Sequence, residues 1–444
     1  MSLASLIRFI YTWGVAGLMS LVIKNGLVVT QNPKREVFKG DVLIEDGRIA
    51  ALGQSLKGDE SLDAKGCAVI PGLINAHGHV SMTLMRAVAD DLNLEQFLDK
   101  TFAVDAKRTR EDVYAGSLAG CAEMLLSGTT SFLDMYYHED AAAQAVEETG
   151  IRGYLGWAVL DDDKTTQKGS PLRNCEKFIK SHRGKPLVNP LVALQGVYVC
   201  SEETFMGAKA LAEREDTLLH MHLQETRYEV HEHEKKAGKR PVAWLDDMGF
   251  LNPRLSAAHC VWMTINEIKA LKKKGVSVAH CPVSNAKLAS GGVAPVPEMQ
   301  REGVAVGLGT DGTSSNNCLD MFQEMKFCAL THKAHRWDAT VLPAQKVLDM
   351  ATIDGARLLH AEKELGSIGI GKLADITIVD MGGVWTIPTD ESTVVSNLVY
   401  SCTGDRVRDV IVGGNPAVVN RKLVNADISK IVSSAGAAAK ALRG

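Results

Sequence analysis

Two patterns of hydrophobic and polar positions alternate along the middle of the chain: short apolar runs and amphipathic stretches. Short apolar runs predict buried strands. These runs cover 130–135, 191–194, 217–223, 256–259, 276–280 and 304–309. Amphipathic stretches predict helices, of which the clearest cover 113–127, 141–149 and 267–274. Alternating strands and helices are typical of repeated βα units, and about 290 residues suffice for one closed barrel, so we predict an α/β fold with a (β/α)8 (TIM) barrel.

Both ends of the chain have a different sequence pattern, in which short strand-like runs are separated by turns. Near the start these are LVIKNGLVV, DVLIEDGRIAALG and CAVIPG, and Asp46-Gly47 in the second is a two-residue hairpin signal. The same pattern of short strand-like runs recurs in residues 374–380 and 407–414. We therefore predict a small β-sandwich domain formed from both chain ends. The expected boundaries are 19–72 plus 361–425 for this domain, 73–360 for the barrel and 426–444 for a C-terminal tail.

The first residues fit neither pattern. Ile7 to Ile23 are mostly apolar with Arg8 as the one charge, a composition shared by secretion signals and anchors. The run is shorter than the roughly 20 residues that span a bilayer, and residues 21–26 already resemble a strand entering a turn. We therefore expect no membrane attachment and interpret residues 1–18 as an extension.

Composition and charge narrow the class of partner. The chain has 444 residues, of which 45% are hydrophobic and 23% charged, which is ordinary for a globular protein. The net charge is −4, and the densest basic run, Lys272 to Lys274, is interpreted as a solvated helix face. Nine cysteines without a C-x-x-C pair argue against a disulfide framework. We expect a cytoplasmic protein that binds a small molecule and no nucleic acid.

Residues able to bind metals or protons lie at or just past the ends of candidate strands. They are His77, His79, His222, Glu225, His259 and Asp311. In a (β/α)8 barrel the C-terminal strand ends converge on one mouth, where active sites lie. Residues more than 230 positions apart are therefore expected to share one pocket.

Four of these residues form a candidate metal site. His77 and His79 are two positions apart, so both imidazoles point to one side of an extended strand. His222 supplies a third ligand and Asp311 a fourth. Imidazoles with a carboxylate suit zinc, and a catalytic zinc site keeps one position open for water. His220 lies deeper on the same strand face as His222, and we interpret it as a hydrogen-bonded core residue.

Two further motifs are set aside. Residues 307–312 fit G-x-G-x-x-G, but no dinucleotide-binding βαβ unit opens there. Residues 231–234 resemble the start of a zinc-protease helix, yet Lys235 stands where H-E-x-x-H requires histidine. We interpret this segment as a solvated helix face.

Several ordered motifs carry a family resemblance between Leu21 and Gly414. They are PGLINAHGHVSMTLMRAVADDLNLEQFL, HLQET, AAHC, HCPVSNAKLASGGVAPVPEM and GLGTDGTSSNN. The chain resembles the amidohydrolase superfamily, in the branch of methylthioadenosine/S-adenosylhomocysteine deaminases and relatives acting on guanine, pterins and triazines. The resemblance implies one divalent ion held by His77, His79, His222 and Asp311. Zinc is the expected ion, with iron or manganese as alternatives.

The resemblance also implies catalytic roles. Glu225 shuttles a proton to the ring nitrogen, His259 orients or polarises the attacking water, and Asp311 accepts a proton from it. Zinc lowers the pKa of water toward neutrality, which supplies a nucleophile for an electron-poor ring carbon. Glu225 follows His222 by three residues, where a carboxyl group can reach past the metal as a general acid/base must. Ser315 and Asn316 are expected to shape the mouth near Asp311, with Ser315 as a candidate substrate-binding residue; the alternative is a purely structural role.

Three positions depart from the pattern of adenosine-type relatives. Gln195 stands where those relatives carry a purine-contacting histidine, and an amide both donates and accepts hydrogen bonds. Asp105, one methylene shorter, is the acid nearest to the place of a ribose-binding glutamate, whereas a strictly ungapped alignment places Ala106 there. Trp157 occupies a place where relatives that bind a homocysteine carboxylate carry arginine, and it either favours an apolar group or packs in the core.

These observations predict a zinc-dependent hydrolytic deaminase of an aromatic nitrogen heterocycle. The substrate is an adenosine-, methylthioadenosine- or S-adenosylhomocysteine-like nucleoside, or a purine base or pterin. The alternative is a hydrolase with another leaving group, such as a chlorotriazine hydrolase; Glu225 favours an amine, which leaves only when protonated. A catalytically silent scaffold is a distant third hypothesis, because the six positions are intact. Homo-oligomerisation through barrel helices is compatible with the sequence, which leaves the substrate, the native metal and the assembly open.

Overall fold

The structure is a computed structural model that describes residues 20–443 except Asn93 and Thr166. The extension expected over residues 1–18 lies outside the described residues. Within the described part, no helix is both long and apolar enough to cross a membrane.

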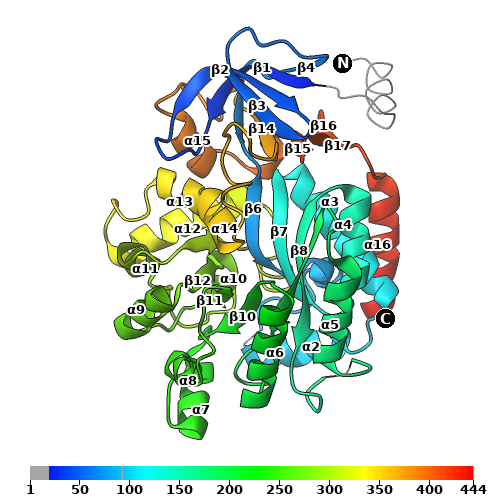
Figure 1. The fold of residues 1–444 in the computed structure, drawn as a ribbon, viewed down its shortest axis with the longest axis vertical. Helices are drawn as coiled ribbons and strands as arrows, with labels where there is room; N and C mark the ends of the chain where they lie inside the picture. The colour runs from blue at the N-terminus through cyan, green and yellow to red at the C-terminus, as the bar shows by residue number, and fades with distance from the viewer. Residues whose placement is uncertain (1–19, 93, 166, 444) are drawn as a thin grey trace.

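Eight parallel strands form the barrel, which confirms the predicted fold (Figure 1). In order they are β6 (Leu73–Gly78), β7 (Thr129–Tyr136), β8 (Arg152–Val159), β9 (Val188–Leu194), β10 (Leu219–Leu223), β11 (Leu255–His259), β12 (Ser277–His280) and β13 (Val306–Leu308). The first and last strands are joined by a single bridge between Gly78 and Asp311, in which the Asp311 amide donates to the His77 carbonyl at 3.0 Å. The barrel therefore closes at the candidate metal ligands.

Helices cover the outside of the barrel and alternate with its strands. They are η1 (Val80–Met85), α2 (Leu94–Asp105), α3 (Arg110–Leu126), α4 (Glu139–Thr149), α5 (Pro171–His182), α6 (Glu202–Arg214), α7 (Arg227–Ala237), α8 (Pro241–Asp247), α9 (Ile265–Lys274), α10 (Pro282–Lys287), α11 (Val296–Glu302), α12 (Met321–Arg336), α13 (Ala344–Met350) and α14 (Ile353–Leu358). The three predicted helices are α3, α4 and α9, and each begins two or three residues earlier than expected. Capping boxes set two of these starts, from Thr109 to Asp112 and from Thr264 to Glu267.

A second, mixed sheet draws strands from both chain ends, as predicted. Its order is β17 (Lys422–Leu423), β16 (Asn415–Val419), β15 (Val407–Val412), β14 (Ile376–Asp380), β5 (Cys67–Pro71), β1 (Leu21–Val29), β2 (Val37–Glu45) and β3 (Arg48–Gly53), with β4 (Glu60–Asp63) beside β1. The predicted hairpin joins β2 to β3, where Asp46 and Gly47 have φ values of 51° and 75°. The sheet lies beyond the end of the barrel at which β6 begins (Figure 1).

An ion pair ties the small sheet to the barrel, and a C-terminal helix packs on the outside of the barrel. A buried ion pair joins Arg152, the first residue of β8, to Asp375 beside β14, with nitrogen–oxygen distances of 3.0 and 3.2 Å. Residues 426–444, expected as a tail, contain helix α16 (Ile428–Arg443), which packs against α3 (Figure 1). Two short helices, α15 (Val394–Tyr400) and η2 (Gly404–Arg406), lie between β14 and β15.

Candidate active site

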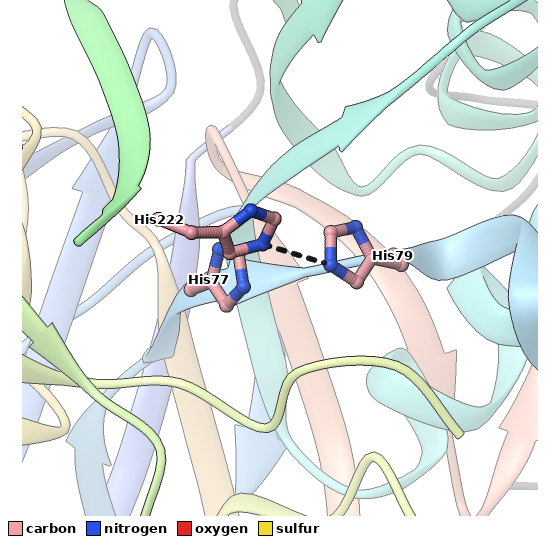
Figure 2. Close-up of side chains that lie close together, drawn as sticks. All are labelled: His77, His79 and His222. Atoms are coloured by element: carbon pink, nitrogen blue, oxygen red, sulfur yellow. Dashed lines mark hydrogen bonds between the residues drawn. The ribbon is translucent and has the colours of Figure 1, made fainter. Parts of the chain in front are cut away.

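Three imidazoles converge at the C-terminal ends of β6 and β10. The ligating nitrogens of His77, His79 and His222 all lie within 4.8 Å of one another. The Nε2 atoms of His79 and His222 face each other at 3.3 Å (Figure 2). The pairing of β6 with β7 is irregular between Asn75 and Gly78, the segment that contains His77. Such irregularities re-aim side chains beside functional sites.

Hydrogen bonds at Nδ1 orient all three rings. His79 donates to the carbonyl of Met135 and His222 to the carbonyl of Gln195, both at 2.7 Å. His77 Nδ1 lies 2.8 Å from Nε2 of His220, whose own Nδ1 lies 2.7 Å from the Ser256 hydroxyl. His220 is thus the buried, hydrogen-bonded residue expected from its position.

These bonds leave the Nε2 atoms available as ligands. A carbonyl only accepts, so a proton on Nδ1 of His79 and of His222 leaves the Nε2 lone pair free. The Nε2 of His77 is buried and has no hydrogen-bond partner among the described residues. A buried, unpartnered imidazole nitrogen beside two others fits a metal ion, and partners at Nδ1 are the usual support of metal-binding histidines.

Asp311 completes this donor set from the far side of the barrel. Its Oδ1 lies 3.5 Å from Nε2 of His77 and 3.2 Å from Nε2 of His79. Its Oδ2 accepts from the hydroxyls of Ser284 at 2.5 Å and Ser315 at 3.1 Å. Burial alone would raise the pKa of Asp311, but the adjacent imidazoles of His77 and His79 hold it well below its usual range. The carboxylate therefore stays ionised and can serve as a ligand.

His259 and Glu225 lie next to the three imidazoles. His259 stacks on His222 with ring centroids 5.3 Å apart, and its Nε2 lies 3.8 Å from a carboxyl oxygen of Glu225. The His259 backbone has a φ of 73°, a left-handed conformation that directs its ring, and Asn285 Nδ2 lies 3.0 Å from its Nδ1. Burial raises the pKa of Glu225, which favours the protonated form that a general acid requires.

The loop that carries Glu225 is held by a second carboxyl group. Glu229, in the first turn of α7, accepts the backbone amides of Gln224 and Glu225, each at 2.9 Å. Burial raises the pKa of Glu229 to about 7. This residue fixes the start of the loop without touching the histidines.

Two candidate substrate residues reach the imidazole cluster through other side chains. Asp105 accepts from Arg108 at 3.2 Å and from the hydroxyl of Tyr136, whose ring lies 6.0 Å from that of His79. The Gln195 carbonyl binds His222, and its side-chain amide donates to the Tyr198 hydroxyl at 3.1 Å.

Trp157 and Asn316 lie farther from the cluster. Trp157 contacts His138 and Phe178 and donates from Nε1 to Gln167 at 2.8 Å. A row of rings joins it to His79 through Tyr136, Tyr137 and His138. Asn316 donates to the Thr310 carbonyl at 2.8 Å and to Glu324, so it supports the strand end before Asp311.

Sequence reasoning missed the supporting residues of this site. They are Arg108, Tyr136, Tyr137, Glu229, Ser284 and Asn285. Ser284 and Asn285 lie in α10, four and five residues after β12 ends at His280, so their place near a strand end was the one available signal. The others are distinguished only by what they contact in the folded chain.

The chain matches known proteins over most of its length. Residues 68–417 match the model of the Amidohydrolase family. A 5′-deoxyadenosine deaminase of Methanosarcina mazei is 42% identical over 428 residues, 95% of this chain and 98% of the relative. A 5-methylthioadenosine/S-adenosylhomocysteine deaminase of Syntrophobacter fumaroxidans is 40% identical over 93% of this chain and 96% of the relative.

Solved structures show the same fold. An adenosine deaminase from Xanthomonas campestris with bound zinc has a TM-score of 0.92 and 35% identity, covering 95% of this chain and 98% of that one. An atrazine chlorohydrolase from Arthrobacter aurescens, complexed with zinc, has a TM-score of 0.87 and 25% identity, covering 94% of this chain and 100% of that one.

Proposed function

Because the chain belongs to the amidohydrolase family, we propose that it is a zinc-dependent deaminase that releases ammonia from an adenosine-type nucleoside. The observation that carries this proposal is the joint position of three oriented imidazoles, Asp311 and the Glu225–His259 pair at one barrel mouth. Metal ligands alone would suit many hydrolases. An acid with a raised pKa beside them suits a leaving amine, which departs only when protonated.

His77, His79, His222 and Asp311 would hold the zinc ion. When bound, zinc lowers the pKa of a water molecule toward neutrality and polarises it for attack. Asp311 would accept a proton from the attacking water; its Oδ2 accepts from Ser284 and Ser315, and its Oδ1 faces the imidazoles. His259 orients the water, since Asn285 and the left-handed backbone fix its ring.

Glu225 carries the proton to the substrate. Its carboxyl group first protonates the ring nitrogen next to the attacked carbon. The carboxylate then takes the proton of the newly added hydroxyl group and passes it to the amino group, which leaves as ammonia. The proton that Asp311 took from water restores the Glu225 carboxyl group. Glu229 holds the backbone of this loop, which keeps the carboxyl group beside His259.

The substrate residues suit a nucleoside with a small apolar 5′ group. We place Asp105 at the ribose hydroxyls, because Arg108 and Tyr136 fix this carboxylate one ring contact away from His79. We place Gln195 at the purine base of the nucleoside. Trp157 ends the row of rings that starts at His79, and it offers no positive charge to an amino-acid carboxylate. We therefore expect 5′-deoxyadenosine and methylthioadenosine to be better substrates than S-adenosylhomocysteine.

The first test measures ammonia release by zinc-loaded protein. The panel contains 5′-deoxyadenosine, methylthioadenosine, adenosine, S-adenosylhomocysteine, guanine, a pterin and an amino-triazine. Ammonia from the 5′-apolar nucleosides at the highest kcat/KM is expected. Silence on all of them with zinc bound would contradict the proposal.

Chloride release is the second candidate activity, favoured by the structural similarity to the atrazine chlorohydrolase. Chloride leaves without a proton, so this reaction has less need of Glu225. Chloride from a chlorotriazine without ammonia from any nucleoside would replace the first proposal with the second.

The variant Glu225→Gln tests the proton shuttle. We expect kcat for deamination to fall by about 10²–10⁴-fold, because an amide cannot transfer the proton. The zinc content should stay unchanged, since Glu225 is not a ligand. Steady-state kinetics and metal analysis measure both quantities. Undiminished turnover would assign the proton transfer to another residue.

A further inference from the structure

A second group of metal-binding side chains lies away from the active site. His280 ends β12, and Cys328 and His332 are four residues apart on α12, so they share one face of that helix. Their exposed fractions are 1%, 0% and 0%. Their candidate ligand atoms all lie within 4.8 Å of one another, as do those of the histidine cluster in the active site.

The two imidazoles of this group face each other through their Nε2 atoms at 3.1 Å. Two nitrogens bound to one tetrahedral zinc at about 2.05 Å are about 3.3 Å apart. The corresponding pair in the active site, His79 and His222, is separated by 3.3 Å. The geometry of the buried pair is therefore close to that of two ligands of one ion.

The surroundings leave these side chains with few other partners. The Nδ1 atoms of His280 and His332 are buried and lack hydrogen-bond partners within the described ranges. Burial lowers the pKa of His332 to about 4 and that of His280 well below its usual value, so both rings are neutral donors. Glu324 lies one turn before Cys328 on the same helix face, buried, with Oε2 also unpartnered in the described part.

We propose that His280, Cys328 and His332 form a second, structural site for a divalent ion of the zinc type. Two imidazoles and a sulfur suit zinc rather than magnesium or calcium, which prefer oxygen. The ion replaces the thiol proton of Cys328, which leaves to solvent, and the resulting thiolate bonds to the metal. The site ties α12 to β12, directly before the segment that brings Ser284 and Asn285 to Asp311 and His259.

Cobalt distinguishes the two sites, because the active-site donors are nitrogen and oxygen only. The full chain is stripped with a chelator and reloaded with Co²⁺ or Zn²⁺. We expect two bound equivalents and a near-ultraviolet sulfur-to-cobalt charge-transfer absorption. Cys328→Ala should lose this absorption and one of the two equivalents. The control variant Cys175→Ala, at a buried cysteine on α5, should keep the absorption and both equivalents.

The active site serves as the second control. The double variant His77→Ala/His79→Ala should lose one equivalent and keep the charge-transfer absorption. One equivalent and no sulfur absorption in the unmodified chain would overturn the proposal, and so would an absorption that persists in Cys328→Ala. The measurements on the unmodified chain decide the question even where a variant fails to fold. They are also independent of whether the chain deaminates a nucleoside.

Discussion

His220 fixes the position of His77 from inside the barrel. It is not itself an expected metal ligand, but its Nε2 lies 2.8 Å from Nδ1 of His77 and its Nδ1 lies 2.7 Å from the Ser256 hydroxyl. A chain of hydrogen bonds thus runs from Ser256 on β11 through His220 on β10 to the candidate ligand His77 on β6. Outer partners of this kind set ring orientation and ligand basicity.

Replacing His220 by Phe removes the hydrogen bond and keeps a ring of similar size. We expect zinc affinity to fall about 10–100-fold, the usual effect of losing an outer partner. Competition with a chromophoric chelator measures the affinity. Ser256→Ala is the matched control, because it removes only the second bond of the chain and should have a smaller effect. Equal affinities in all three proteins would contradict this role.

The raised pKa of Glu229 leads us to expect that the stability of the folded chain depends on pH. Burial raises its pKa to about 7 in the folded chain, against about 4.3 for an unperturbed glutamate. Between these values the unfolded chain has released the proton and the folded chain has kept it. Stability therefore falls as pH rises through this window, by up to about 4 kcal/mol from this residue.

The variant Glu229→Gln cannot ionise and should lose this dependence. We expect its stability relative to the unmodified chain to increase from pH 4.5 to pH 7, measured as urea midpoints across the series. Glu234→Gln, at an exposed position of the same helix, controls for the change of side chain. Parallel pH profiles of Glu229→Gln and the unmodified chain would contradict the assignment.

At the scale of elements, local signals determine where helices begin. Helix α9 starts at Ile265 because Thr264 accepts from the amide of Glu267, whose carboxylate accepts the Thr264 amide in return. Hydrophobic periodicity alone placed the start at Glu267, because Ile265 is followed by the polar residues Asn266 and Glu267. The cap is a local signal, and reading it would have corrected the boundary.

Thr264→Ala should destabilise the protein by about 1 kcal/mol, because the amide of Glu267 loses its partner. The urea midpoint measures the change. Thr264→Ser keeps the hydroxyl oxygen and should have little effect. A loss of the same size in both variants would point to the methyl group rather than the cap.

Strand β8 is an element that its hydrophobic pattern does not predict. It reads RGYLGWAV, begins with a charged residue and contains two glycines, so its hydrophobic pattern is weak. The structure buries Arg152 nevertheless, because Asp375 and the Pro186 carbonyl satisfy its guanidinium. Asp375 lies 223 positions away in the sequence, and no local window contains it.

At the scale of the whole molecule, this ion pair joins the barrel to the small sheet. Both partners are buried, with exposed fractions of 6% each, and Asp375 also accepts the Gly413 amide at 2.7 Å. Removing one partner of a buried pair leaves an uncompensated charge, whereas removing both charges together costs less.

Arg152→Met should therefore destabilise the chain by about 3–5 kcal/mol, and Arg152→Met/Asp375→Asn should recover part of this loss while keeping an acceptor for Gly413. Thermal and urea denaturation measure the difference. The exposed pair of Arg254 and Asp216 gives the control, because Arg254→Met should cost less than about 1 kcal/mol. Equal losses at the two pairs would contradict the role of the buried one.

The sequence by itself determined the class of fold and the placement of the candidate ligands at strand ends. Strand and helix periodicity, hairpin signals and the order of polar residues are local properties, and they survive without knowledge of what each segment contacts. Only the tertiary structure decided that Asp311 meets His77 across the barrel closure, that His220 supports His77 from 143 positions away, and that His280 faces His332. These contacts depend on strand register and barrel closure, which join residues that no local pattern relates.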